Sequence, residues 1–266
     1  MQYAWLNGEW VSSSEEKIPS QSEGHGLFET VCVRKGSLRF WDKHWSRMTK
    51  SAQALEMSLG QDSKDILRAS KELIKKNRLR DGAIKLICHH KETGNEWAII
   101  TREQCYSPEQ YEKGFRIRIH PNARCLNKEK YGHKRIDHTG PRVARKEAYS
   151  LGFDETLFIN KSGYLCEGSY SNVFFVKEGE LFTPAPNCGL LPGIARGEVL
   201  RWATERGIPT HEGQYTLEDL SQCDEVLITN ALAGAMPVAS IELSCEEIAF
   251  DLKRAFVTME LVKHFT

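Results

Sequence analysis

Apolar positions in the first hundred residues change from strand spacing to helix spacing and back again. Short apolar runs separated by turn residues such as Asn7-Gly8 and Lys35-Gly36 predict strands over 3–6, 9–11, 28–33 and 38–41. Apolar residues at helical spacing then predict two helices, over 42–57 and 63–77. Two more strands are expected at 83–89 and 96–101. Strands, then helices, then strands are typical of a small α+β domain.

The pattern beyond residue 110 alternates more often between the two spacings. Strands are predicted over 115–120, 155–160, 163–166, 172–177, 180–183 and 224–229. Helices are predicted over 141–151, 194–206 and 246–263. A further short helix is predicted after Thr216, which would be its N-cap. Ser107-Pro108-Glu109-Gln110 reads as a linker. We therefore expect a mixed α+β or α/β fold with a smaller domain over 1–106, a linker over 107–110 and a larger domain over 111–266.

Composition narrows the function classes. Lys plus Arg and Asp plus Glu both number 36, so the formal net charge is zero and favours neither nucleic acid nor an acidic membrane surface. The eight cysteines include no Cys-x-x-Cys pair, which argues against a structural zinc site, and we expect no metal. With no signal peptide in the sequence, we expect reduced thiols in a cytoplasmic protein.

Two segments in the second half suggest a specific ligand chemistry. Glu167 ends one strand and precedes the small-residue turn 168–171, so it offers a fixed negative charge. The Gly/Pro-marked loop 189–193 opens a helix whose N-terminus can bind an anion without a lysine. A basic ring nitrogen and a phosphate would satisfy this pair, as pyridoxal 5'-phosphate (PLP) does. That cofactor also needs a lysine, and Lys134 is the candidate.

Each candidate also has an ordinary structural explanation. Lys134 could be a surface lysine, Glu167 a solvated glutamate at a strand end, and Arg47 a solvated arginine on a helix. The loop 189–193 could be a plain connection, because a Gly-rich loop alone is a weak signal. The loop 230–235 could likewise be a tight turn rather than a ligand site.

The order of these motifs resembles one family over nearly the whole chain. The motifs are His44-x-x-Arg47, Lys134, Glu167-Gly168-Ser169-x-Ser171-Asn172, Leu191-Pro192-Gly193-Ile194-x-Arg196, and two Asp-Glu pairs at 154–155 and 224–225. They are similar to those of the class IV aminotransferase family, the fold-type IV PLP enzymes. That family includes branched-chain and D-amino acid aminotransferases and aminodeoxychorismate lyases. The resemblance implies two domains, the larger with a β-barrel-like sheet and flanking helices.

The resemblance also implies roles for individual residues. Lys134 would be the catalytic lysine, bonded covalently to the cofactor and then moving a proton. Glu167 would pair with the pyridine nitrogen, and Asn172 would support the cofactor pocket. Phosphate contacts would come from Arg47, Ile194, Ala195, Ala231 and Leu232. A homodimer with its active site near the subunit interface is implied as well.

Several positions depart from the family pattern and bear on the substrate. Ala195 and Ala231 stand where a phosphate-binding hydroxyl is often found. His89 and His90 follow Cys88 where many aminotransferases carry Arg-Gly, and His138-Thr139 replaces a tyrosine typical of branched-chain enzymes. The candidates for contact with a small-molecule amino substrate are Phe28, His89 and His138, with His90 left open.

These departures separate the reactions that share the scaffold. The segments Phe28-x-Thr30 and Thr229-Asn230-Ala231-Leu232, followed by Met236-Pro237-Val238, look most like aminodeoxychorismate lyases. We therefore expect a PLP-dependent lyase that releases pyruvate and 4-aminobenzoate, a step of folate biosynthesis. The alternative is an aminotransferase acting on D-amino acids or on branched-chain or small aliphatic ones. A catalytically inactive binding module is a minor alternative.

Overall fold

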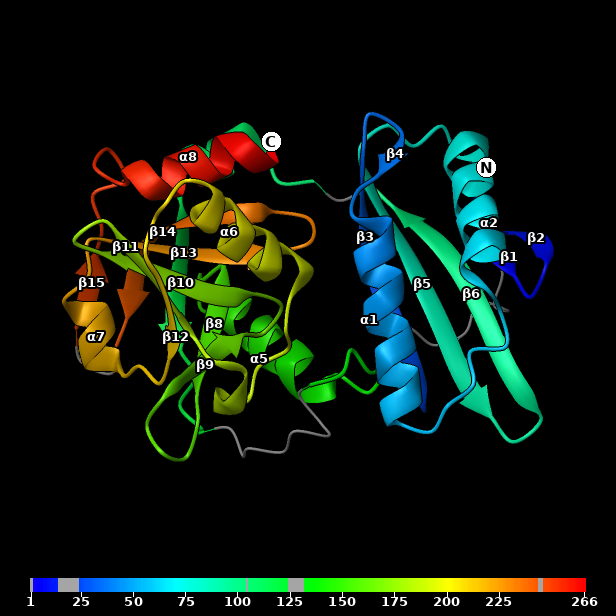
Figure 1. Cartoon of the computed structure of the whole chain (residues 1–266), viewed down its shortest axis with the longest axis horizontal. Helices are drawn as coiled ribbons and strands as arrows, with labels where there is room; N and C mark the ends of the chain where they lie inside the picture. Colours follow the sequence, from blue (N-terminus) through cyan, green and yellow to red (C-terminus); the bar gives the residue numbers. More distant parts are fainter. Residues whose placement is uncertain (1, 14–23, 104, 124–131, 244–245) are drawn as a thin grey trace. The chain divides into compact units, whose positions relative to one another are not determined.

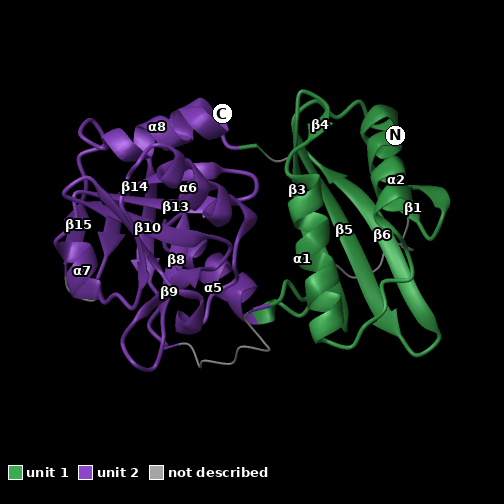
Figure 2. Ribbon diagram, in the orientation of Figure 1, with its two compact units in different colours: residues 1–105, 133–139 green, residues 106–132, 140–266 purple. Residues whose placement is uncertain are grey.

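Two sheets organise the chain, one in each of two units (Figures 1 and 2). The computed structural model describes residues 2–13, 24–103, 105–123, 132–243 and 246–266. Unit 1 comprises residues 1–105 together with 133–139, and unit 2 comprises 106–132 and 140–266. The segment around Lys134, which we expected in the second domain, therefore belongs to unit 1. Its backbone pairs with a strand of that unit, as described below.

Unit 1 is a six-stranded sheet in the order β2-β1-β6-β5-β3-β4, and its neighbouring strands are antiparallel. The strands are β1 (Tyr3–Leu6), β2 (Glu9–Ser12), β3 (Gly26–Arg34), β4 (Ser37–Leu38), β5 (Gly82–Lys91) and β6 (Gly94–Arg102). Helices α1 (Trp41–Ala54) and α2 (Ser63–Lys76) pack against it. The α2 helix begins where the Asp62 side chain accepts a hydrogen bond from the Asp65 amide, and it buries Ile66, Leu73 and Ile74.

The strands of unit 1 place different residues on the two faces of the sheet. Leu27 and Val31 belong to the large core shared with the two helices. Phe28 and Ile87 belong to a second cluster that also contains Ile136 from the returning segment 133–139. Because side chains alternate along a strand, Phe28 and Thr30 point to the same face, away from the helices.

Unit 2 is built on a nine-stranded curled sheet in the order β12-β11-β10-β13-β14-β7-β8-β9, with β15 paired to β14. Three of its pairs are parallel: β11 with β12, β14 with β7, and β7 with β8. The strands are β7 (Phe115–Ile119), β8 (Glu155–Ile159), β9 (Leu165–Gly168), β10 (Asn172–Lys177), β11 (Glu180–Pro184), β12 (Thr210–Gly213), β13 (Glu225–Asn230), β14 (Gly234–Glu242) and β15 (Glu247–Ala249). The α-helices are α3 (Pro108–Lys113), α5 (Thr139–Ser150), α6 (Ile194–Glu205), α7 (Leu217–Ser221) and α8 (Phe256–Phe265), with a 3₁₀ turn η1 (Pro186–Cys188). The expected mixed fold with a barrel-like sheet is confirmed.

Some local predictions were wrong. The expected linker over 107–110 begins α3, because Ser107 and Gln110 form a capping box and Pro108 fits the first turn. The expected helix over 246–263 is instead β15, a turn and the shorter α8; Ile248 pairs with Ile241 of β14. Strands β12 and β14 were missed. Among the described residues, no helix has the length and apolar character needed to cross a membrane.

Candidate active site

Lys134 is held in place by strand-like pairing with β3. The Phe28 amide donates to the Lys134 carbonyl at 3.0 Å, and the Ile136 amide donates to the Gly26 carbonyl at 3.0 Å. Ile136 is fully buried, which anchors the segment in the apolar cluster around Phe28. The Lys134 ammonium lies 4.7 Å from the centroid of the Phe28 ring. The backbone at this lysine and just after it is thus fixed by two hydrogen bonds to β3.

A second lysine, which the sequence analysis did not identify, also lies over the Phe28 ring. Lys85 of β5 lies opposite Thr30 of β3, and its ammonium is also 4.7 Å from the Phe28 ring centroid. Only 5% of Lys85 is exposed. A signal was available in the sequence: Lys85 interrupts the apolar run 83–88, so neither face of that strand looks solvent-exposed.

The three histidines considered for substrate contact have different environments. His138 has its ring centroid 6.5 Å from that of Phe28, so the structure brings it to the same ring as Lys134. His89 is buried and pairs with Gly26 at the end of the β3–β5 ladder. His90 is exposed and its Nδ1 lies 3.0 Å from the Asn95 side-chain oxygen.

Arg47 forms an ion pair inside unit 1. Its Nε and Nη2 donate to the two oxygens of Glu29 at 2.8 and 2.7 Å, and His44 Nδ1 donates to Glu29 at 2.7 Å. Burial alone would raise the pKa of Glu29, but Arg47 and His44 outweigh it and hold that pKa well below its ordinary range. Burial lowers the pKa of His44, against the raising effect of Glu29, and the charges of Arg47 and Lys134 lower it further. Glu29 uses two of the five N–H donors of Arg47, so the side chain is oriented by this contact.

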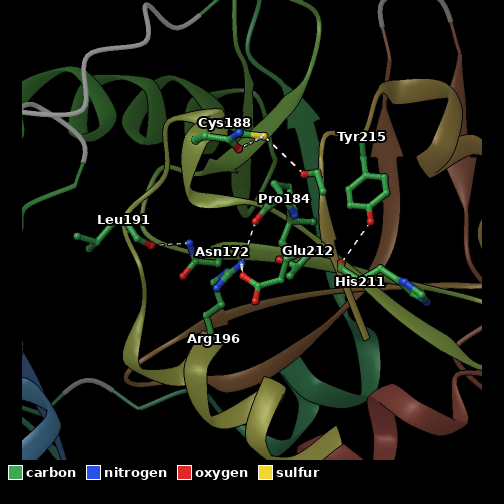
Figure 3. A network of polar contacts seen from close by, with 12 residues as sticks. Asn172, Pro184, Cys188, Leu191, Arg196, His211, Glu212 and Tyr215 are labelled. Atoms are coloured by element: carbon green, nitrogen blue, oxygen red, sulfur yellow. Dashed lines mark hydrogen bonds and ion pairs between the residues drawn. The ribbon is translucent and has the colours of Figure 1, made fainter. Parts of the chain in front are cut away.

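In unit 2, Glu167 and Asn172 meet at one residue of the loop before α6. The Glu167 carboxylate accepts from the Leu191 amide at 2.9 Å and from the Asn172 amide group at 3.4 Å. The Asn172 amide group also donates to the Leu191 carbonyl at 2.9 Å (Figure 3). Both side chains are at least nine-tenths buried. The Glu167 carboxylate is therefore held by one backbone amide and one buried side-chain amide, and it is not solvated at the end of its strand.

The loop leads into a helix N-terminus suited to an anion. Gly193 is the N-cap of α6 and no side chain caps it, so the first amides, including Ile194 and Ala195, have no partner within the helix. A Cβ at Gly193 would lie 2.2 Å from Asn172 Oδ1, so the close approach of loop and Asn172 needs glycine. Buried Arg196 donates to the Pro184 carbonyl at 2.9 Å and to Glu212 at 2.5 Å, which ties α6 to β11 and β12 (Figure 3).

The loop after β13 is shaped by its own side chain. Asn230 Oδ1 accepts from the amides of Leu232 and Ala233 at 2.9 and 2.8 Å. The phosphate contact expected from Leu232 would require this hydrogen bond to be exchanged or shared. Ala231 is partly buried in the same turn.

The residues present suit PLP chemically. Taken separately, unit 1 holds a lysine on a fixed backbone segment, and unit 2 holds a buried, hydrogen-bonded carboxylate and a helix N-terminus with no side-chain cap. These are the groups that an aldehyde, a pyridine nitrogen and a phosphate require.

Comparison with known proteins identifies the family. The family described as amino-transferase class IV matches residues 26–241. The chain belongs to the class IV aminotransferase family. It is a PLP-dependent enzyme.

Individual members of the family are distant from this chain in sequence but close in fold. The branched-chain-amino-acid aminotransferase of Escherichia coli K12 is 27% identical over 265 residues, which covers 90% of this chain and 85% of that protein. A structure of the Escherichia coli enzyme has a TM-score of 0.86 at 24% identity and covers 99% of this chain and 92% of its own. A Legionella pneumophila structure assigned provisionally as a 4-amino-4-deoxychorismate lyase has a TM-score of 0.81 at 23% identity, covering 96% and 97%. At such identities the structural likeness establishes the fold alone.

Proposed function

We propose that the chain is a 4-amino-4-deoxychorismate lyase, which eliminates pyruvate from its substrate and leaves 4-aminobenzoate. Bound PLP supplies an electron sink for the carbon that loses its proton. Lys134 would hold the cofactor and, once the substrate amine has displaced it, remove that proton as a general base. Glu167 would face the ring nitrogen, with Asn172 supporting it.

The phosphate would be held mainly by backbone donors. Ile194 and Ala195 at the start of α6 are the main candidates, with Ala231 and Leu232 from the loop after β13 as a second group. Arg47 would add a charged contact while Glu29 keeps its guanidinium oriented. Hydroxyl contacts are absent at Ala195 and Ala231, so binding would depend on these groups.

We choose the lyase over the aminotransferase because of the basic side chains that lie around the Phe28 ring. Besides Lys134, the buried Lys85 ammonium lies at 4.7 Å from the ring centroid and His138 lies at its edge. A substrate with two carboxylates, such as aminodeoxychorismate, would be attracted by a second cation. A branched-chain amino acid has a single carboxylate and an apolar side chain, so it gains less from that group.

Transamination of a branched-chain or other small amino acid is the second candidate. It is favoured by the name of the Escherichia coli relative and by the apolar neighbours of Phe28, which include Ile87, Ile100 and Ile136. In that case Lys134 and Glu167 would keep their roles, and the apolar neighbours would contact the substrate side chain. A homodimer is proposed for either reaction. The exposed Val143 and Tyr149 on α5 give it an apolar contact surface, and analytical ultracentrifugation tests it.

One pair of assays separates the two reactions. Protein loaded with PLP is incubated with enzymatically generated aminodeoxychorismate, and 4-aminobenzoate and pyruvate are followed together. The same preparation is then given L-leucine, L-valine or D-alanine with 2-oxoglutarate or pyruvate. Equimolar release of both products supports the lyase. Amino-group transfer without such release would overturn it in favour of the aminotransferase, and neither activity would favour the inactive binding module.

A further inference from the structure

Glu167 lies just before the turn between β9 and β10, and Asn172 lies just after it. The backbone of this turn is held by a carboxylate from outside it. Glu155 is the first residue of β8 and is 3% exposed. One of its oxygens accepts from the Ser169 amide at 3.0 Å, and the other accepts from Ser171 Oγ at 3.0 Å and the Tyr170 amide at 3.3 Å. The Ser169 hydroxyl also hydrogen-bonds to the first oxygen. One buried carboxylate thus satisfies successive donors of the turn.

The turn closes tightly around this carboxylate. The Gly168 amide donates to the Ser171 carbonyl at 2.7 Å. A Cβ at Gly168 would lie 2.2 Å from Ser171 Oγ and 3.1 Å from Glu155 Cδ. Because Gly168 has no side chain, the Glu155 carboxylate and the Ser171 hydroxyl can occupy the space beside it. The path of the chain from Glu167 to Asn172 therefore depends on Glu155.

A cation on α5 completes the arrangement. Burial lowers the pKa of Arg145, but Glu155, Tyr106 and Tyr149 together outweigh it, so the pKa of Arg145 is raised. The Arg145 guanidinium lies 4.9 Å from the ring centroid of Tyr170 and 5.0 Å from that of Tyr149. The same cation thus lies over the Tyr170 ring and interacts electrostatically with Glu155.

We propose that Glu155 is the positioning residue for Glu167. It fixes residues 168–171 so that the Glu167 carboxylate and the Asn172 amide group meet at Leu191. In this proposal Glu155 acts only through the turn. The inference rests on the proposed place of Glu167 at the cofactor ring nitrogen.

A second buried glutamate provides a matched control. Glu225 is the first residue of β13 and is 4% exposed. Its carboxylate accepts from the amides of Val257 and Thr258 at 3.1 and 2.8 Å, at the start of α8. Glu155 and Glu225 therefore match in burial, strand position and type of partner, and differ in the segment that they hold.

The test is a double-mutant cycle on the full chain. The variants are E155Q, E225Q and E167Q, with E155Q/E167Q and E225Q/E167Q. PLP affinity and the absorption maximum of the bound cofactor are read by spectral titration, together with kcat and KM. We expect E155Q to weaken PLP affinity about tenfold or more, as loss of hydrogen bonds to a charged group does, and to shift the absorption maximum in the same direction as E167Q. E225Q should leave both at the wild-type values.

Non-additivity decides the mechanism. If Glu155 acts through Glu167, then E155Q/E167Q is no weaker in PLP affinity than E167Q alone, since the side chain that is positioned has already lost its charge. Additive losses, or an E155Q protein with unchanged affinity and spectrum, would overturn the proposal. If E155Q does not fold, S171A removes one donor to Glu155 without touching the carboxylate. It should shift the spectrum in the same direction by less, and an unchanged spectrum in S171A would count against the proposal.

Amide hydrogen exchange on the cofactor-free protein separates this proposal from the proposed function. E155Q should raise exchange at 168–172 and E225Q at 256–259, each without affecting the other segment. If the wild-type protein bound no PLP while the two variants still showed this exchange pattern, the role of Glu167 would be refuted. Glu155 would remain the residue that anchors the turn. Unchanged exchange at 168–172 in E155Q would refute the positioning itself.

Discussion

Two buried carboxylates beside proposed cofactor residues are satisfied in opposite ways. Glu29 in unit 1 is bound by the guanidinium of Arg47 and the ring of His44, both from α1. Glu155 in unit 2 is bound mostly by neutral donors, the amides and hydroxyls of the turn 169–171. Glu29 therefore orients a side chain, whereas Glu155 shapes a stretch of backbone.

The difference predicts how each site responds to change. A side chain released from its partner can bind another anion, so loss of Glu29 affects the side chains of Arg47 and His44 and leaves the backbone of β3 in place. A backbone turn released from its carboxylate loses several hydrogen bonds together. The variants below test this contrast.

The largest effect is expected for Lys134→Ala, which tests the proposed attachment of the cofactor to Lys134. We expect turnover to fall by about 10²–10⁴-fold or more, because the group that moves the proton is lost. The fold should survive, since the Lys134 backbone makes the pairing with Phe28. Borohydride reduction followed by peptide mass spectrometry should place the cofactor on Lys134 in the wild type and on no residue in the variant. Lys161→Ala, in an exposed turn, is the control, and a cofactor mass retained in Lys134→Ala would refute the assignment.

Removing the charge on the unit 1 side should have a large effect on stability. Glu29→Ala leaves Arg47 largely buried without its carboxylate, and breaking a buried ion pair in this way costs about 3–5 kcal/mol. Urea unfolding followed by tryptophan fluorescence measures the loss. Glu247→Ala breaks the exposed pair with Arg116 and the hydrogen bond from Ser240 Oγ, and should cost much less than Glu29→Ala. Equal losses in the two variants would show that burial does not distinguish them.

Lys85→Met tests whether the second cation near Phe28 contacts the substrate. If it binds a substrate carboxylate, KM for aminodeoxychorismate should rise by about 10–100-fold, the range for a hydrogen bond to a charged group, with little change in PLP affinity. The matched control is Lys76→Met, because Lys76 is exposed and lies over the rings of Tyr3 and Trp10. A variant with wild-type KM would remove the argument for a second carboxylate.

The smallest expected effect is a change in the pH dependence of stability. The folded-state pKa values of His44 and Glu29 are both lowered, so the unfolded chain binds more protons than the folded one as the solution is acidified. Stability should fall as pH drops below 6.5, the ordinary pKa of His44, and further below 4.5, that of Glu29. In Glu29→Gln the decline below 4.5 should become shallower. Melting temperatures from pH 8 to 3 measure this, and parallel curves would contradict it.

Much of the fold was predictable because many elements are encoded by local spacing. The α2 helix has an N-cap and apolar residues one turn apart, and both signals lie within fourteen residues. The predicted helix over 246–263 failed because Ile248 and Leu252 are spaced for a helix, while pairing of Ile248 with Ile241 of β14 decides the structure. Such pairing depends on a distant segment that no local pattern reports.

The candidate site divides in the same way. Motif order drew attention to Lys134, Glu167 and Asn172 and included Glu155 in an Asp-Glu pair, but it did not indicate which residues Glu155 or Glu29 would bind. Glu155 lies fourteen positions from Ser169, and Glu29 lies eighteen from Arg47, so neither contact has a local signature. A partial signal existed at Glu155, since an acid that opens a strongly apolar strand has to find its partners in the interior.

The pairing of β3 with the Lys134 segment has a consequence for synthesis of the protein. Phe28 and Lys134 are joined by a backbone hydrogen bond, so unit 1 is not a continuous piece of chain. On the ribosome, the sheet and helices of residues 1–105 emerge first, yet the segment that completes this unit follows only after the 106–132 stretch has been made. Part of unit 2 is therefore already translated before the lysine can take its place, and a fragment ending at residue 105 would lack it. The segment that carries Lys134 therefore joins unit 1 only about halfway through translation, after residues 1–105 have been made.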